Sequence, residues 1–117
     1  MNNLIVDAAN DKILLKIIID KQSYTSEYSN SRENFDNLSL IIFDFLKKKN
    51  TKIEHIANIF VNHGPGKYSG TRLSIVICKA ICLAYDIKLY SYGSEQINGN
   101  NYGKILDLHK KGDLISG

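Results

Sequence analysis

Two apolar runs near the start of the chain have the pattern of buried strands. Residues 3–7 (NLIVD) and 13–19 (ILLKIII) are almost continuously apolar, and a polar turn at residues 9–12 separates them. Aromatic and polar side chains then alternate over residues 24–28, which indicates a third strand nearer the edge of a sheet. The first part of the chain therefore predicts an antiparallel meander.

The hydrophobic period changes after this meander. Residues 35–49 predict a helix, because apolar side chains recur three and four positions apart. These side chains are Leu38, Ile41, Ile42, Phe45 and Leu46. Lysines at 47–49 complement the negative end of the helix dipole, and a contact with RNA is the alternative interpretation.

The remaining pattern predicts a strand at residues 56–62, a helix at 71–85 and a last strand at 87–90. The order β-β-β-α-β-α-β indicates an α/β fold with a five-stranded mixed sheet and packed helices. We assign residues 1–97 to one lobe. Residues 98–117 are expected to form a short, mobile tail that contains an amphipathic stretch at 104–111.

Composition narrows the class of protein. The chain has 117 residues, of which 44% are hydrophobic and 23% charged, and these values suit one globular domain. Cys78 and Cys82 stand one helical turn apart in an apolar run and are interpreted as small hydrophobic side chains of a cytoplasmic protein. The sequence shows no membrane segment. A formal charge of +3 permits contact with nucleic acid without demonstrating it.

The segment HGPGKYSGTR, between the predicted central strand and the second helix, is the most informative. Gly64, Pro65 and Gly66 specify a particular turn, because glycine permits unusual backbone angles and proline fixes its own. Ser69 and Gly70 favour a helix start, whose free N–H groups suit an anion. The loop is therefore either a phosphate cradle or a tight connection without a ligand. Its spacing matches neither GxxxxGK[ST] nor GxGxxG.

Over the string VNHGPGKYSGTRLSIVICKAICLAYDIKLYSYGSEQI, the chain resembles the TsaB family, whose pattern runs GPGSFTGLR. The residues at the family's positions are Gly64, Pro65, Gly66, Gly70 and Arg72. Tyr68 and Ser69 are similar to the family's residues, whereas Lys67 and Thr71 depart from them. The resemblance covers about positions 3–97.

The first strand resembles the family's opening ILAIDTS, and Asp7 is retained there. Ala8 and Ala9 replace hydroxyl residues that could touch a phosphate or a hydrated metal ion, which weakens an interpretation as a nucleotide hydrolase. The resemblance implies one lobe of the RNase H-like or actin-like ATPase fold, in the glycoprotease-like superfamily. A second lobe usually follows in the family, and the sequence shows none here.

The resemblance also implies a function. It predicts an accessory subunit that binds and stabilises TsaD, the catalytic subunit that transfers threonylcarbamoyl to adenosine in tRNA. A TsaE-like ATPase would join the complex, so that tRNA and ATP would be used by the complex and no cofactor would be intrinsic to this chain. Two alternatives stay open: a nucleotide-binding ATPase-like or glycoprotease-like enzyme domain that uses Asp7 and the glycine loop, and a homodimeric structural remnant.

Both predicted helices carry more apolar surface than one sheet covers, which favours a helical partner interface. The predicted interface residues are Leu40, Phe43, Leu73, Val76, Ile77, Ala80, Ile81 and Ala84. Burial within this domain and a homodimer are the alternatives. Arg72, in the first turn of the second helix, is expected to hold an acidic partner or to cap a carbonyl.

The sequence offers no catalytic or metal-binding pattern. His55, His63 and His109 lack the spacing of a metal pair, and no serine stands in a GxSxG turn. We therefore assign no catalytic residue and no metal ligand. The predicted contact residues of the loop are Asp7, Gly64, Pro65, Gly66, Ser69, Gly70 and Arg72.

Overall fold

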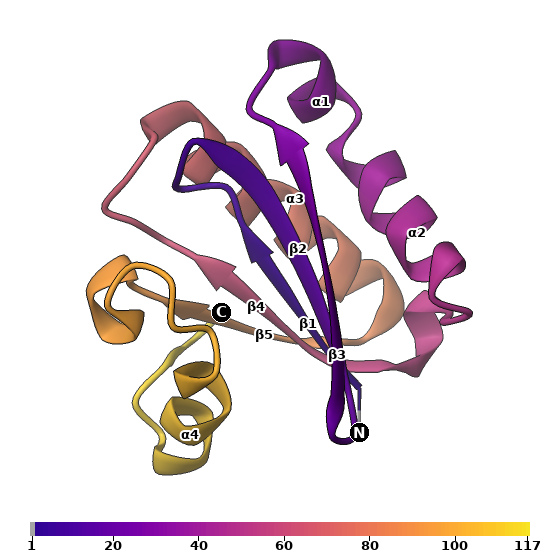
Figure 1. Cartoon of the computed structure of the whole chain (residues 1–117). Coiled ribbons are helices and arrows are strands. Elements are labelled where there is room, and N and C mark those ends of the chain that lie inside the picture. The colour runs from indigo at the N-terminus through magenta and orange to yellow at the C-terminus, as the bar shows by residue number, and fades with distance from the viewer. Residues whose placement is uncertain (1) are drawn as a thin grey trace.

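The strands form one mixed sheet in the structure, a computed structural model that describes residues 2–117 (Figure 1). They are β1 (Asn2–Asp7), β2 (Lys12–Ile19), β3 (Gln22–Ser29), β4 (Ile56–Asn62), β5 (Lys88–Tyr92) and β6 (Ile115–Ser116). The order across the sheet is β3-β2-β1-β4-β5-β6. Strands β1, β4 and β5 are parallel, and the other pairs are antiparallel. The predicted α/β class and the antiparallel meander are confirmed.

Four helices and two short 3₁₀ helices connect the strands in the described residues. The helices are α1 (Arg32–Asp36), α2 (Leu38–Lys48), α3 (Tyr68–Tyr85) and α4 (Lys104–Lys111), and the 3₁₀ helices are η1 (Ile53–His55) and η2 (Ser94–Ile97). Among residues 2–117, no helix has the length and apolar character needed to cross a membrane.

The helix predicted over residues 35–49 is two helices in the structure. The Ser31 hydroxyl accepts a hydrogen bond from the N–H of Asn34 and caps α1, which starts earlier than predicted. Asn37 then leaves the helical conformation, with φ −110° and ψ 19°, and its carbonyl accepts the first hydrogen bond of α2. The second predicted helix also starts earlier, at Tyr68, because the N–H of Thr71 donates to the carbonyl of Lys67 and closes the first turn.

The sheet is covered on both faces, because alternate side chains of a strand point to opposite sides. Leu4 and Val6 of β1 join the core beneath α2 and α3. Ile5, between them, joins a second core with Phe60 of β4 and Ile105 of α4. Figure 1 shows α4 on the side of the sheet opposite to α3.

The segment after residue 97, expected to be a mobile tail, forms regular structure that packs on the sheet through one buried side chain. The amphipathic stretch predicted at 104–111 is α4, and its Ile105 is fully buried on the sheet. The chain then adds β6, a sixth strand where five were predicted, antiparallel to β5. Two residues are too few to show a strand period, so the sequence pattern could not reveal β6.

We expect Ile105→Ala to lower the free energy of unfolding by about 2–5 kcal/mol, because it leaves a cavity between α4 and the sheet. Urea denaturation followed by circular dichroism measures the change. The control is Val76→Ala, which truncates a side chain that is 62% exposed and should cost less than about 0.5 kcal/mol. Equal losses in both variants would contradict the docking of α4.

Candidate functional site

The carboxyl ends of the three parallel strands carry polar side chains that meet at one edge of the sheet. Asp7, Asn62 and Tyr92 are the last residues of β1, β4 and β5. All three side chains are fully buried. In open α/β sheets, this edge is where ligand sites form. The polar cluster around Asp7 is therefore the candidate functional site.

The Asp7 carboxylate accepts hydrogen bonds from both sides. Its Oδ2 accepts from Asn62 Nδ2 at 3.0 Å, from the Tyr92 hydroxyl at 3.1 Å and from the Tyr102 hydroxyl at 2.9 Å. Its Oδ1 accepts from the backbone N–H of Ala9 at 3.0 Å. The protein itself therefore supplies the donors that a buried carboxylate needs.

The two tyrosines act as neutral donors in this cluster. Burial raises the pKa of Tyr92, and the negative charge of Asp7 raises it further. The pKa of Tyr102 is raised for the same two reasons, burial first and then Asp7. A raised pKa keeps each hydroxyl protonated well into the alkaline range, so both hydroxyls continue to donate to the carboxylate.

Asn62 connects the cluster to the glycine loop. Its Nδ2 donates to Asp7 and also to the Ser94 hydroxyl at 3.0 Å, while its Oδ1 accepts from the N–H of Gly64 at 2.7 Å. The Ser94 hydroxyl in turn donates to the carbonyl of Pro65 at 3.0 Å. The predicted contact residues Asp7, Gly64 and Pro65 thus belong to one hydrogen-bond network.

The glycine loop lies directly on the end of β1. A Cβ atom added at Gly66 would stand 2.3 Å from the carbonyl oxygen of Ala9, and one at Gly70 would stand 2.7 Å from that of Ala8. The N–H of Lys67 donates to the same Ala9 carbonyl at 2.8 Å. Glycine is required at both positions because the backbones touch. The loop is therefore packed tightly against the residues that follow β1.

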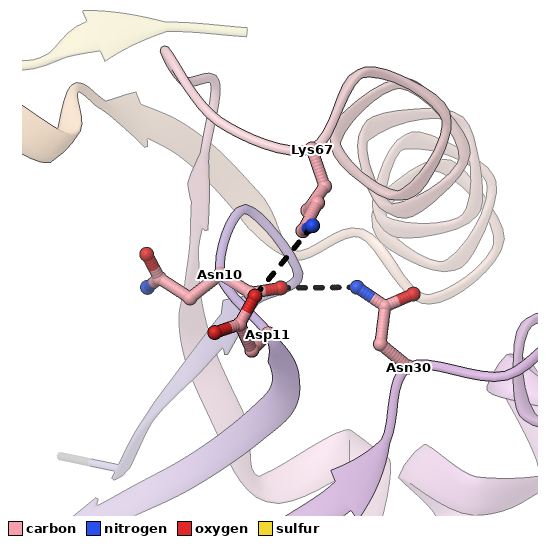
Figure 2. Close-up of polar contacts among 4 residues, drawn as sticks. All are labelled: Asn10, Asp11, Asn30 and Lys67. Atoms are coloured by element: carbon pink, nitrogen blue, oxygen red, sulfur yellow. Dashed lines mark hydrogen bonds and ion pairs between the residues drawn. The ribbon is translucent and has the colours of Figure 1, made fainter.

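Two surface contacts connect the turn between β1 and β2 to neighbouring segments. Figure 2 shows the Asn30 side chain donating to the carbonyl of Asn10 at 3.0 Å, and Lys67 paired with Asp11 at 3.6 Å. The turn between β1 and β2 is therefore held by the end of β3 and by the loop before α3 (Figure 2). Lys67, a departure from the TsaB pattern, serves this contact.

Ser69 and Arg72 lie outside the network, in the first turns of α3. Both are exposed. Arg72 donates from Nη1 to the Tyr68 hydroxyl, and its guanidinium lies 5.1 Å from the centre of the Tyr68 ring. Arg72 therefore contacts Tyr68 of its own helix, whereas the sequence suggested an acidic partner or a backbone carbonyl.

Thr71 is the other departure from the family pattern, which has leucine there. Its side chain is 7% exposed, and among residues 2–117 its Oγ1 is the buried side-chain atom without a hydrogen-bond partner. A buried hydroxyl without a partner carries a desolvation cost of about 1–3 kcal/mol. Thr71 thus places a polar atom where an apolar one would fit.

Sequence reasoning found Asp7 but missed three of its donors, Asn62, Tyr92 and Tyr102. Asn62 could have been found, because it ends the strand predicted at 56–62, whereas Tyr92 lies beyond the strand predicted at 87–90. Tyr102 stands in a glycine- and asparagine-rich turn, and no sequence signal placed its hydroxyl 95 positions away on Asp7.

The chemistry of the cluster is that of one carboxylate surrounded by neutral donors. Within the described part of the chain, no group of three or more His, Cys, Asp or Glu side chains is placed to hold a metal ion. The thiols of Cys78 and Cys82 are buried in the core, and burial raises the pKa of Cys82 to about 11. These thiols behave as the small hydrophobic side chains that the sequence predicted.

Some of the predicted interface residues are exposed, and others are partly or fully buried. Leu40 of α2 is 68% exposed and Val76 of α3 is 62% exposed. Ala80 and Ala84 are also exposed, whereas Phe43, Leu73 and Ile77 are partly buried. Ile81 is 6% exposed and lies in the core with Cys78, because it faces the sheet. The outer faces of α2 and α3 therefore carry apolar side chains, but Ile81 is not one of them.

No family model and no curated protein matches the sequence. Solved structures match its fold. An uncharacterised Pseudomonas aeruginosa protein, described as similar to the peptidase YeaZ, superposes with a TM-score of 0.72 at 15% identity, over 79% of this chain and 43% of that one. YeaZ from the same organism gives 0.71 at 14% identity, over 80% and 45%.

Thermus thermophilus RuvC, in complex with a Holliday junction substrate, has a TM-score of 0.59 at 10% identity over 84% of this chain and 68% of that one. These likenesses establish an RNase H-like α/β fold similar to YeaZ and RuvC. The chain spans less than half of the length of the two YeaZ-type structures.

We expect Tyr102→Phe to lower the free energy of unfolding by about 1.5–3 kcal/mol, because it removes a hydrogen bond to a buried carboxylate and keeps the ring. Chemical denaturation near neutral pH measures the loss. The control is Tyr24→Phe, whose hydroxyl makes an exposed hydrogen bond to Gln22 and should cost less than about 0.5 kcal/mol. A loss no larger than that of the control would contradict the role of Tyr102.

We expect Thr71→Val to raise the free energy of unfolding by about 1 kcal/mol, because valine keeps the shape and removes the unpaired hydroxyl. Thr51→Val is the matched control. Thr51 is equally buried, at 7% exposure, but its hydroxyl donates to the carbonyl of Lys49 at 3.0 Å. Thr51→Val should therefore lower the free energy of unfolding. Thermal melting of both variants shows whether the melting temperature rises for Thr71→Val and falls for Thr51→Val.

Proposed function

We propose that this chain is a TsaB-type accessory subunit that binds and stabilises a TsaD-like catalytic subunit during threonylcarbamoyl transfer to tRNA adenosine. YeaZ proteins are TsaB-type proteins, and the likeness of the fold to YeaZ supports the assignment. The glycine-loop residues that match the TsaB pattern support it from the sequence. The proposal concerns the lobe formed by this chain.

The observation that carries the proposal is the unpartnered apolar surface of α2 and α3. Leu40, Val76 and Leu83 are exposed by 68%, 62% and 86%. Ala80 and Ala84 add small side chains to the exposed part of α3 and permit close approach of another helix. Apolar side chains gathered on exposed helices are typical of a protein interface.

The Asp7 cluster supports a non-catalytic role. A carboxylate that binds substrate or metal needs free lone pairs facing an open site, whereas the Asp7 oxygens accept from protein donors and the residue is fully buried. The cluster instead holds the glycine loop in place. In this proposal, ATP is handled by a TsaE-like partner and tRNA is bound through the complex in the cytoplasm.

The enzyme alternative makes a different prediction for the same cluster. An ATPase-like or glycoprotease-like domain would use Asp7 and the glycine loop, and it would turn over nucleotide or peptide on its own. The contact of Gly66 with Ala9 and the loss of hydroxyls at Ala8 and Ala9 disfavour this alternative. Metal-dependent ATP hydrolysis by the purified chain would establish it.

We expect the chain to co-purify with TsaD from the same organism as a stable complex, and Val76→Glu to abolish co-purification, because a charge would be buried between apolar helices. Size-exclusion chromatography with light scattering measures complex formation. Ile115→Glu is the matched control, because Ile115 is also 62% exposed but lies on β6. This control should retain the complex.

Both variants should melt like the wild type, since neither side chain is buried. A folded wild-type chain that ignores TsaD and runs as a homodimer would overturn the accessory role and support the structural remnant. Loss of the complex in both variants would show that the outer face of α3 is not the interface.

A further inference from the structure

A groove lies at the end of the molecule where α2 and α3 finish, far along the strands from the Asp7 cluster. It has a volume of about 560 Å³ and lies between the end of α2, the connection that contains η1, and the last residue of α3. The lining residues that matter here are Phe43, Leu46, Lys47, Lys52, Ile53 and Tyr85. We call this feature the basic groove.

The apolar part of the basic groove offers an aromatic surface. Leu46 and Ile53 are buried and form its floor. Phe43 and Tyr85 pack edge to face, with ring centres 6.1 Å apart and planes at 61°. Tyr85 remains 43% exposed, so a planar ligand can reach it. A ring held by a second ring presents a fixed stacking surface.

The lysines around the basic groove differ in their contacts. Lys48 pairs with Asp44 at 3.1 Å, and Lys49 lies 5.1 Å from the centre of the Tyr24 ring. Lys47 and Lys52 have no ion pair among the described residues, and both line the groove. Glu54 is its single acidic lining residue. Two unpaired ammonium groups beside one carboxylate leave the groove positive.

The end of α2 carries the partial negative charge of a helix C-terminus, and hydrogen bonds from the following turn occupy two of its carbonyls. The carbonyl of Leu46 accepts from the N–H groups of Lys49 and Thr51, and the carbonyl of Lys47 accepts from the N–H of Asn50. The Thr51 hydroxyl donates to the carbonyl of Lys49. The turn therefore satisfies the carbonyls of Leu46 and Lys47, and the two full positive charges of Lys47 and Lys52 exceed the partial negative charge of the helix end.

We propose that the basic groove binds single-stranded nucleic acid, with an unpaired base stacked on Tyr85 and neighbouring phosphates held by Lys47 and Lys52. An aromatic ring beside unpaired cations is the combination that recognises a base together with its phosphate. An acidic peptide would use the lysines but not the aromatic ring. A duplex keeps its bases stacked internally and offers no base to Tyr85. Phe43 lines this groove and is also one of the predicted interface residues, but the proposal does not depend on TsaD, because the test uses the chain alone.

Fluorescence anisotropy of a labelled mixed-sequence RNA of about ten nucleotides, titrated with the purified chain at low salt, tests the proposal. Lys47→Glu/Lys52→Glu should weaken binding more than about ten-fold, because two positive side chains that hold phosphates become negative and repel them. Lys110→Glu/Lys111→Glu, on exposed positions of α4, changes the net charge equally and should cost about two-fold. Tyr85→Ala should weaken binding about ten-fold and Tyr85→Phe should preserve it, because stacking needs only the ring.

Two phosphate contacts predict a slope of about −1.4 for log K against log salt. Equal weakening by the two double variants, or unchanged binding in Tyr85→Ala, would overturn the proposal in favour of non-specific charge. Equal binding of a poly-glutamate peptide would assign the groove to acidic protein segments instead. Binding of AMP without binding of the strand would assign it to a free nucleotide. Thermal melts of each variant confirm that the fold is intact.

Discussion

A fully buried carboxylate, Asp7, joins the ends of three parallel strands, and the geometry of the surrounding loops depends on it. Moving a charge out of water is costly unless hydrogen bonds replace the lost solvent. Here the replacement donors come from β4, β5 and the turn before α4. Each donor ties the element that carries it to the end of β1, so one side chain connects three other segments.

This arrangement links the two faces of the molecule. Asp7 lies on the side of the sheet that α4 covers, whereas the glycine loop leads to α3 on the opposite side. Asn62 connects the two, since it contacts both Asp7 and the N–H of Gly64. The hydrogen-bond partners of Asp7 at this edge are therefore the protein's own side chains, and the surfaces that we propose for recognition are the exposed helices and the basic groove.

The elements with a strong hydrophobic period could be predicted from the sequence, and those defined by single polar residues could not. The buried run at 56–62 became β4 with the same bounds, because an apolar segment followed by a glycine turn has few alternatives. The break at Asn37 and the short strand β6 depend on local hydrogen bonds without a period. Ile81 shows a similar limit: on a helix that is apolar all round, the sequence does not say which side faces the sheet.

The hydrogen bonds of Asp7 reach across almost the whole chain, to partners 55, 85 and 95 positions later. During synthesis on a ribosome, β1 emerges 95 residues before Tyr102. The meander and its helices can collapse early, since their contacts are local. The Asp7 carboxylate stays hydrated until β4, β5 and Tyr102 have been synthesised, so the buried cluster can close only after Tyr102 has emerged.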